Sequence, residues 1–295
     1  LAGPVGAQSL NFSSYPRTIP DSLHSITAGP DNAVWFSTGG GVLGRVSLSG
    51  DISESRPFGS NKALGGLATG SDGALWVAER QGADRIGRST IAGFGTEFVV
   101  PTQDASLEEL TAGPDGALWF TENGANQIGR ITTAGVITEF AIPTPSSAPL
   151  GITAGPDGAV WFTEYTANKI GRITTAGVVS EFPVPTSFSG LRDIVTGSDG
   201  ALWFTEYEGN KIGRISATGV ISEFPVLTDN SQPTSIAAGP DGALWFTETG
   251  SHKIGRITTG GVVSEFAAPA FVQPTDLTIG PDGAIWFTDS FNKIG

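Results

Sequence analysis

Seven tryptophan residues recur along the chain at a nearly constant interval, and this periodicity constrains the fold more than any other feature. They lie at positions 35, 76, 119, 161, 203, 245 and 286, so the successive steps are 41, 43, 42, 42, 42 and 41 residues. Each tryptophan lies in the same phrase, of which Gly155–Phe162 (GPDGAVWF) is typical. A period of roughly 40 to 45 residues is typical of β-propellers, in which every repeat forms one four-stranded sheet. The sequence therefore predicts an all-β protein, a single seven-bladed propeller that spans residues 1–295.

One repeat is enough to predict the strands of a blade. We expect strands at 150–154, 159–164, 169–174 and 178–184. The turn after the first strand, Gly155–Gly158, has Pro, Asp and Gly where a tight turn favours them. The second strand is almost continuously apolar, which suits a sheet covered on both faces, with Trp161 and Phe162 pointing in opposite directions. In the third strand, Gly171 leaves room for a large neighbouring side chain.

The order of the strand types predicts how the ring closes. The fourth strand recurs around Tyr15, Ser55, Phe98, Phe140, Phe182, Phe224 and Phe266. Its first copy, near residues 11–15, precedes every first strand, whereas the last repeat stops at Gly295 without a fourth strand. We therefore expect the N-terminal strand to complete the last blade, which removes an exposed sheet edge. Ser55 replaces the usual aromatic residue and predicts a weaker outer strand.

Composition limits the partners and the chemistry of the protein. The net charge of -13 is spread over the repeats and disfavours nucleic acid and anionic membranes, and no apolar run is long enough to span a bilayer. The absence of Cys excludes disulfides, thiolate metal sites and a Cys nucleophile. We expect a monomer. Since the chain has no Met, we also expect that an upstream segment was removed, and a secreted or cell-surface location is one hypothesis.

Antiparallel strand order places the starts of the first strands and the ends of the second strands on one face of the ring. The inner ring, defined by the position two residues before the apolar Ile or Leu of the first strand, contains His24, Gly65, Glu108, Leu150, Arg192, Thr234 and Thr275. The outer ring, at the end of the second strand, contains Thr38, Glu79, Glu122, Glu164, Glu206, Glu248 and Asp289. We expect both rings to surround the mouth of the central channel.

The outer carboxylates have two interpretations. In the structural one, each pairs across its own hairpin with a cation of the following Lys-Ile-Gly-Arg phrase, as Glu164 would with Lys169 or Arg172. In the functional one, carboxylates at the channel mouth hold a metal or another cation, and Glu79 and Asp289 are the candidates. The Asp residues of the seven turns lack the closely spaced oxygen ligands of a calcium loop, and backbone geometry explains them.

The two histidines differ in position. His24 belongs to the inner ring, where it is either a polar rim residue or a catalytic base. His252 lies in a turn where other repeats have Asn, and we expect it to be exposed to solvent. The chain has no phosphate-binding loop, no nucleophile elbow and no His-Glu-x-x-His pair, and two histidines are too few for a three-His metal site.

The phrases of residues 152–158, 161–164, 168–174 and 180–185, taken together, resemble the virginiamycin B lyase (streptogramin lyase) family of seven-bladed propellers. The resemblance covers essentially the whole chain. It implies a family whose lyases linearise streptogramin B antibiotics by elimination across an ester bond, with the help of magnesium. It also implies a site with a His at the start of one blade's first strand, a Glu-Pro-His phrase in the next blade, and an acidic residue near the end of a second strand.

This chain departs from that implied site. The first His position is occupied by Thr234, and the Glu-Pro-His phrase is replaced by Gln273, Pro274 and Thr275. Only the acidic residue has a counterpart, Asp289. The resemblance therefore predicts the fold without the residues that the family's elimination reaction uses.

The third to sixth repeats are near-copies of one another, so a specific site has to depend on residues that are singular to one blade. In the inner ring these are His24, Glu108 and Arg192. We predict a non-catalytic binding or scaffold module that takes a small molecule or a protein at the channel mouth without a cofactor. Its candidate contact residues are His24, Glu108, Arg192, Thr234 and Thr275. The alternative is a metal-assisted lyase of the streptogramin B type, or another small-molecule enzyme, with His24 as base and with magnesium held by Glu79 or Asp289.

Overall fold

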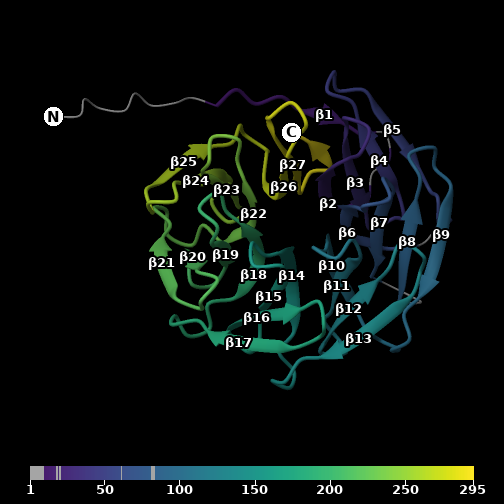
Figure 1. Cartoon of the computed structure of the whole chain (residues 1–295). Helices are drawn as coiled ribbons and strands as arrows, with labels where there is room; N and C mark the ends of the chain where they lie inside the picture. The colour runs from purple at the N-terminus through teal and green to yellow at the C-terminus, as the bar shows by residue number, and fades with distance from the viewer. Residues whose placement is uncertain (1–9, 18, 20, 61, 81–83) are drawn as a thin grey trace.

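The computed structural model describes residues 10–17, 19, 21–60, 62–80 and 84–295, and it shows seven four-stranded antiparallel sheets arranged in a ring (Figure 1). All secondary-structure elements assigned within these residues are β-strands. The described part of the chain contains no helix that could cross a membrane. The predicted all-β, seven-bladed propeller is confirmed. The blades are numbered below from the N-terminal side.

Each blade is named by its four strands. Blade 1 contains β2 (Leu23–Ala28), β3 (Val34–Thr38), β4 (Leu43–Val46) and β5 (Ile52–Ser55). Blade 2 contains β6 (Leu64–Thr69), β7 (Leu75–Glu79), β8 (Arg85–Ser89) and β9 (Gly95–Val99). Blade 3 contains β10 (Leu107–Ala112), β11 (Leu118–Glu122), β12 (Gln127–Ile131) and β13 (Ile137–Ala141). Blade 4 contains β14 (Pro149–Ala154), β15 (Ala159–Glu164), β16 (Lys169–Thr174) and β17 (Val179–Pro183).

The remaining blades follow the same order. Blade 5 contains β18 (Leu191–Thr196), β19 (Leu202–Glu206), β20 (Lys211–Ile215) and β21 (Ile221–Pro225). Blade 6 contains β22 (Pro233–Ala238), β23 (Leu244–Glu248), β24 (Lys253–Ile257) and β25 (Val263–Ala267). Blade 7 contains β26 (Pro274–Ile279), β27 (Ile285–Asp289) and β28 (Lys293–Ile294), and β1 (Tyr15–Pro16) is its fourth strand.

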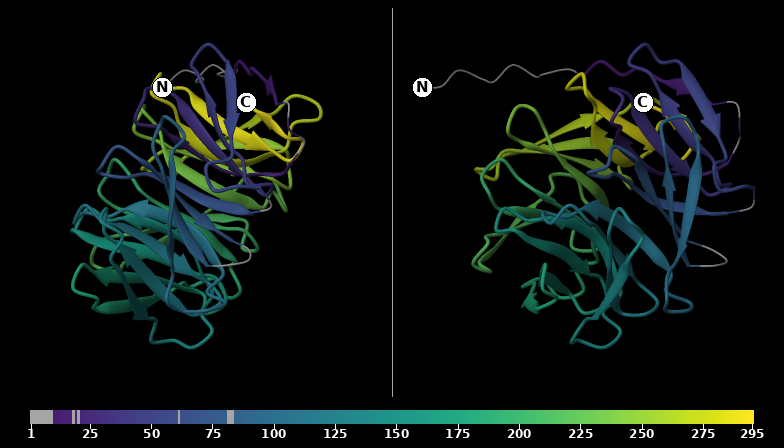
Figure 2. Two further views of the ribbon diagram at one scale, coloured as in Figure 1. Left: turned by 90° about the vertical axis from the view of Figure 1, so that its right-hand side faces the viewer. Right: turned by 45° about the vertical axis from the view of Figure 1, so that its right-hand side comes forward.

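The ring closes through the N-terminal strand, as predicted. Tyr15 of β1 lies opposite Ile294 of β28, and β2 of blade 1 contacts β26 of blade 7. The N-terminal and C-terminal segments, purple and yellow, lie side by side in every view (Figures 1 and 2). Tyr15 also stacks on Trp286 with ring centroids 5.5 Å apart, as Phe182 stacks on Trp161 within blade 4. Among the described residues no ring stacks on Trp35, because Ser55 occupies the corresponding position.

The core consists of layers between neighbouring blades. Trp161 packs against Leu202 and Phe204 of blade 5, whereas Phe162 packs against Trp119 of blade 3. The predicted opposite orientation of Trp161 and Phe162 is therefore confirmed. Gly171 leaves room for the side chain of Phe162. A Cβ atom at position 171 would overlap the Phe162 ring, which lies on the adjacent strand of the same blade.

Each tryptophan is anchored to the turn of its own repeat. Trp161 Nε1 donates a hydrogen bond of 3.0 Å to Asp157 Oδ1, and Arg172 Nε donates one of 2.6 Å to Asp157 Oδ2. The arrangement holds for the indole of every repeat. Backbone geometry explains these Asp residues only in part, since each carboxylate also receives the buried indole N–H.

A β-bulge interrupts every inner strand close to the channel. In blade 4, Pro149 lies opposite Glu164 and Ile152 lies opposite Phe162, so one extra residue is inserted between them. The same shift occurs in the other inner strands. A bulge breaks the strict alternation of side chains. Two successive residues of an inner strand can therefore both face the axis.

Candidate functional site

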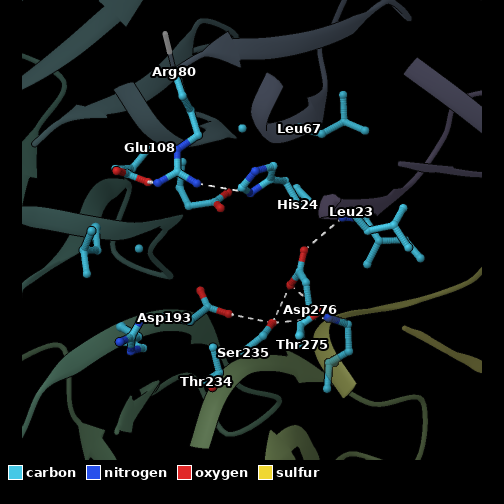
Figure 3. A pocket seen from close by; sticks show the side chains of 18 residues that line it. Leu23, His24, Leu67, Arg80, Glu108, Asp193, Thr234, Ser235, Thr275 and Asp276 are labelled. Carbon is cyan, nitrogen blue, oxygen red and sulfur yellow. Dashed lines mark hydrogen bonds and ion pairs between the residues drawn. The ribbon is translucent and has the colours of Figure 1, made fainter. Parts of the chain in front are cut away.

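A cavity of about 400 Å³ lies where the inner strands converge on the axis, and the bulges supply most of its lining (Figure 3). All members of the predicted inner ring contribute to it: His24, Gly65, Glu108, Leu150, Arg192, Thr234 and Thr275. Residues one position later in the chain contribute as well: Ser25, Glu109, Gly151, Asp193, Ser235 and Asp276. The structure thus brings the five predicted contact residues to one cavity and adds a second ring to them.

Three carboxyl groups of this second ring, those of Glu109, Asp193 and Asp276, were missed by the sequence analysis. Asp193 Oδ2 accepts a hydrogen bond of 2.8 Å from Ile236 N in blade 6, and Asp276 Oδ2 accepts one of 2.9 Å from Ile26 N in blade 1. These two aspartates therefore join the inner strands of neighbouring blades. Their variation among otherwise similar repeats was the sequence signal available for finding them.

Ser235 connects the two aspartates. Its Oγ lies 3.1 Å from Asp193 Oδ2 and 2.7 Å from Asp276 Oδ1, so a single hydroxyl hydrogen serves two carboxyl oxygens (Figure 3). The carboxyl of Glu109 receives no hydrogen bond from the described residues, and it lies against Gly66, where a Cβ atom would be 2.5 Å from Glu109 Oε2. Of these three carboxyl groups, that of Glu109 is the one without a hydrogen-bond donor among the described residues.

Burial raises the pKa of all three carboxyl groups, and repulsion by neighbouring carboxylates adds to the effect for Glu109 and Asp193. Burial raises the pKa of Asp193 to about 7, and the negative charge of Asp276 adds to that effect. The pKa of Glu109 is raised well above its ordinary value, first by burial and then by Asp276 and Asp193. Burial also raises the pKa of Asp276, against the hydrogen bond from Ser235. Near neutral pH the trio therefore retains protons and carries less than its full negative charge.

A second cluster joins three blades at the cavity. Arg80 Nη2 lies 2.6 Å from Glu108 Oε2, and Arg80 Nη1 lies 3.1 Å from His24 Nδ1 (Figure 3). Because a guanidinium group has no acceptor, Nδ1 accepts this hydrogen bond, and the proton of the neutral imidazole is on Nε2. Burial, followed by the charge of Arg80, lowers the pKa of His24. His24 is therefore neutral near pH 7, with one ring nitrogen engaged by Arg80.

Arg192 provides a cation of a different kind. Its guanidinium carbon lies 4.0 Å from the ring centroid of Tyr207 and 5.8 Å from that of Tyr165. The buried Nε atom has no hydrogen-bond partner, and no carboxylate of the described residues forms an ion pair with this side chain. Tyr165, Tyr207 and Arg80 each follow an outer-ring residue directly. These positions, which vary strongly among the repeats, were also missed.

The structural interpretation of the outer ring is wrong for blades 4 to 6. Lys169 Nζ lies 3.1 Å from Glu181 Oε2 of the fourth strand, and Arg172 pairs with Asp157. Both carboxyl oxygens of Glu164 are buried and have no hydrogen-bond partner among the described residues. Lys211 and Lys253 repeat the pattern with Glu223 and Glu265. The lysines pair with the fourth strand because a lysine ammonium group remains hydrated at the rim of the blade, whereas the end of the second strand is enclosed on both faces.

The two candidate metal ligands do not line the cavity. Glu79 pairs with Lys62 at 3.1 Å, and Asp289 Oδ1 accepts hydrogen bonds from the backbone N–H groups of Phe291 and Lys293 at 2.8 and 2.9 Å. Within the described ranges, no group of three or more His, Cys, Asp or Glu residues is arranged to hold a metal ion. Asp289 caps a turn, and Glu79 shares the ammonium group of Lys62 with Glu97. Neither carboxylate is grouped with further oxygen ligands of the described residues, so these residues do not fit a magnesium ion.

The remaining candidates are uncharged or distant from the cavity. Thr234 Oγ1 lies 3.0 Å from Gln232 O and 2.9 Å from Thr249 Oγ1. Thr275 Oγ1 lies 2.8 Å from Thr288 Oγ1. Both hydroxyls therefore find partners within their own blade. His252 is exposed, as expected, in a turn outside the cavity lining.

Comparisons with known proteins agree on one group. The sequence model of the virginiamycin B lyase family matches residues 7–234 and 186–295. A solved streptogramin B lyase has 38% sequence identity and a TM-score of 0.91, with 96% of this chain and 95% of that chain covered. Selenomethionine-substituted virginiamycin B lyase from Staphylococcus aureus has 39% identity and a TM-score of 0.90, with 95% and 96% covered.

A third solved structure is a catalytically inactive His-to-Ala variant of the Staphylococcus aureus enzyme with quinupristin. It has 39% identity and a TM-score of 0.91, with 96% of this chain and 97% of that chain covered. No curated protein sequence matches the chain significantly. The likeness to the solved lyases extends over nearly the full length of both chains.

Proposed function

The chain belongs to the virginiamycin B lyase family, and from this premise we propose that it is a non-catalytic member that binds a small polar molecule at the mouth of its central channel. The main observation in support of this proposal is that two residues of the cavity lining, Thr234 and Thr275, are threonines. The resemblance implies histidines at these positions. Neither threonine hydroxyl titrates near neutral pH, and each has a partner in its own blade.

The elimination reaction of the family needs a base near the proton that is removed and an electrophile on the leaving oxygen. A threonine side chain supplies neither the base nor the electrophile. The groups that contact Glu79 and Asp289 leave these carboxylates unsuited to hold a metal ion. The remaining imidazole of the cavity, that of His24, already accepts a hydrogen bond from Arg80. The cavity therefore offers charge and shape for recognition without an assembled acid–base pair.

Binding is supported by the distribution of the singular residues. The third to sixth repeats are near-copies of one another, yet Glu108 and Arg192 differ from their counterparts in these blades. Both line the same cavity as His24 of blade 1 and Arg80 of blade 2. A scaffold that used only the outer surface would not require such differences at the axis. Charged groups that converge in a concave site are the usual arrangement for recognition of a small ligand.

The proposal is tested by incubating the full chain with quinupristin and magnesium chloride and following ring opening by liquid chromatography and mass spectrometry. The expected rate equals that of a buffer control, while a streptogramin B lyase run in parallel opens the ring. Magnesium added alone in a calorimeter is expected to release no binding heat. Ring opening above the control rate would overturn the non-catalytic assignment.

The second candidate function is the metal-assisted lyase, and the observation that favours it is the 38% identity to a solved streptogramin B lyase. In this alternative His24 is the base. Turnover that is abolished by His24→Ala and retained in His252→Ala would support the alternative, because the second histidine lies outside the cavity. Turnover that survives both substitutions would exclude His24 as the base and require another group.

A further inference from the structure

Two groups at the cavity, the Arg192 guanidinium and the Glu109 carboxyl, have no partner of opposite charge in direct contact among the described residues. Arg192 is held by the rings of Tyr165 and Tyr207, but no carboxylate of the described residues forms an ion pair with its guanidinium group, and its buried Nε has no acceptor among them. A ligand that brings a carboxylate to Arg192 would supply the anionic partner that this side chain lacks, and a planar guanidinium suits a carboxylate especially well.

The other group is Glu109, whose carboxyl receives no hydrogen bond from the described residues and lines the same cavity as the carboxyl groups of Asp193 and Asp276. The two aspartates are partly satisfied by backbone N–H groups and by Ser235. Among the described residues Glu109 has no such donors, so a cationic group placed beside it would favour loss of the carboxyl proton and pair with the resulting carboxylate. An ammonium group, with three N–H donors, has the appropriate chemistry.

Building on the proposed binding function, we propose that the cavity takes a small zwitterion, with the carboxylate of the ligand on Arg192 and its ammonium group on Glu109. A ligand that carries only an anion would enter a channel lined by the carboxyl groups of Glu109, Asp193 and Asp276, besides that of Glu108, in a protein of net charge -13. A ligand that carries only a cation would leave Arg192 without a counter-charge. A zwitterion satisfies both groups without adding net charge to the cavity.

The size of the cavity agrees with this class of ligand. Its volume of about 400 Å³ is at the lower end of the range of about 300–1,000 Å³ that is typical of small-molecule sites. The tyrosine rings beside Arg192 hold the guanidinium in place before a ligand arrives, which reduces the entropy lost on binding. Arg80, by contrast, is already neutralised by Glu108 and is not available for the ligand carboxylate.

The test uses the full chain and a series of amino acids that differ in the separation of their charges: β-alanine, γ-aminobutyrate and ε-aminocaproate. Butyrate and butylammonium provide the single charges at the same ionic strength. Isothermal titration calorimetry near pH 7 is expected to show that at least one zwitterion binds about tenfold or more tightly than either singly charged molecule. The preferred chain length then reports the separation between the two charged groups of the site.

Variants identify the residues. Arg192→Gln is expected to weaken binding of the preferred zwitterion by about tenfold or more, and Arg192→Lys is expected to restore part of the loss. Glu109→Gln is expected to weaken binding of the zwitterion and to leave any binding of butyrate unweakened. Arg56→Gln is the matched control, because Arg56 is exposed and lies outside the cavity lining. Thermal unfolding of each variant checks that it is folded.

The inference is overturned if no zwitterion of the series binds more tightly than butyrate and butylammonium, a comparison that requires no variant. Binding of butyrate that Arg192→Gln removes, without a gain for any zwitterion, would also overturn it, yet would leave the proposed binding function in place. Ring opening of quinupristin would instead refute the proposed non-catalytic function. The two failures are therefore distinguishable.

Discussion

Lys169 Nζ lies 3.1 Å from Glu181 Oε2, and this ion pair leaves both carboxyl oxygens of Glu164 buried without a partner in the same blade. Burial, with the nearby charge of Glu181, raises the pKa of Glu164 to about 8. The pKa of Glu181 is instead lowered, because hydrogen bonds from Thr144 and Lys169 outweigh its partial burial. Two glutamates in one blade therefore have opposite protonation at neutral pH.

The first prediction concerns stability against pH. From pH 4.5, the ordinary pKa of the carboxyl group, to about 8, the folded chain keeps a proton on Glu164 that the unfolded chain has lost. The free energy of unfolding therefore falls as pH rises through this window, by up to about 1.4 kcal/mol per pH unit for this group. Glu122 and Glu206 have the same property. Urea unfolding at a series of pH values measures the slope.

Glu164→Gln isolates this contribution. The amide has no proton to lose, so the variant should gain stability relative to the wild type progressively from about pH 5 to about pH 8. Asp115→Asn is the matched control, because Asp115 has a lowered pKa and is not one of the groups that shift the pKa of Glu164. Since Asp115 is ionised in both states over that window, its difference from the wild type should stay constant with pH. A Glu164→Gln difference that is independent of pH would contradict the protonated state of this carboxyl.

The second prediction concerns the charge of His24. Burial and Arg80 lower its pKa, so its imidazole should titrate below 6.5, the ordinary value for the group. Arg80→Gln removes one of the two causes and should raise the pKa of His24 part of the way back. Proton NMR of the imidazole C–H signals measures both values, and His252→Asn assigns the signals because the chain has two histidines. An unchanged pKa in Arg80→Gln would show that Arg80 does not act on this ring.

The third prediction concerns the anchor of the repeated tryptophans. Asp157→Ala removes the acceptor of Trp161 Nε1 and leaves a buried donor unsatisfied, so we expect a loss of about 1–3 kcal/mol in the free energy of unfolding. Asp157→Asn keeps a side-chain oxygen for the indole and loses only the charge opposite Arg172, so a smaller loss is expected. Equal losses in the two variants would mean that the ion pair matters and the indole hydrogen bond does not.

The fourth prediction concerns ring closure. Tyr15 stacks on Trp286 from the strand that completes blade 7. Tyr15→Ala should therefore cost about 2–4 kcal/mol, somewhat less than a fully buried aromatic residue, since Tyr15 is half-buried. Phe94→Ala, at a ring that is 75% exposed, should change stability by less than about 0.5 kcal/mol. If the unfolding midpoints of the two variants agreed, the N-terminal strand would not be holding the last blade.

Several features of the fold could be predicted because they depend on patterns that the sequence itself displays. The predicted strands 159–164 and 169–174 coincide with β15 and β16, and the expected pairing of the N-terminal strand with blade 7 was observed. The inner ring was also located correctly, since the start of each first strand is marked by the phrase that follows it. The exchange of partners around Lys169 was not predicted, because the paired Glu181 lies on a different strand from the expected Glu164.

The tryptophan period, the turn residues and the order of strand types determined the number of blades and the closure of the ring, because these patterns can be followed along the sequence from one repeat to the next. The tertiary structure decided which groups share the axis. The bulges turn Glu109, Asp193 and Asp276 into the cavity against simple alternation. Asp193 then meets the N–H of Ile236, 43 residues further along the chain. Such contacts depend on how the blades are placed around the ring, and no repeat contains that information by itself.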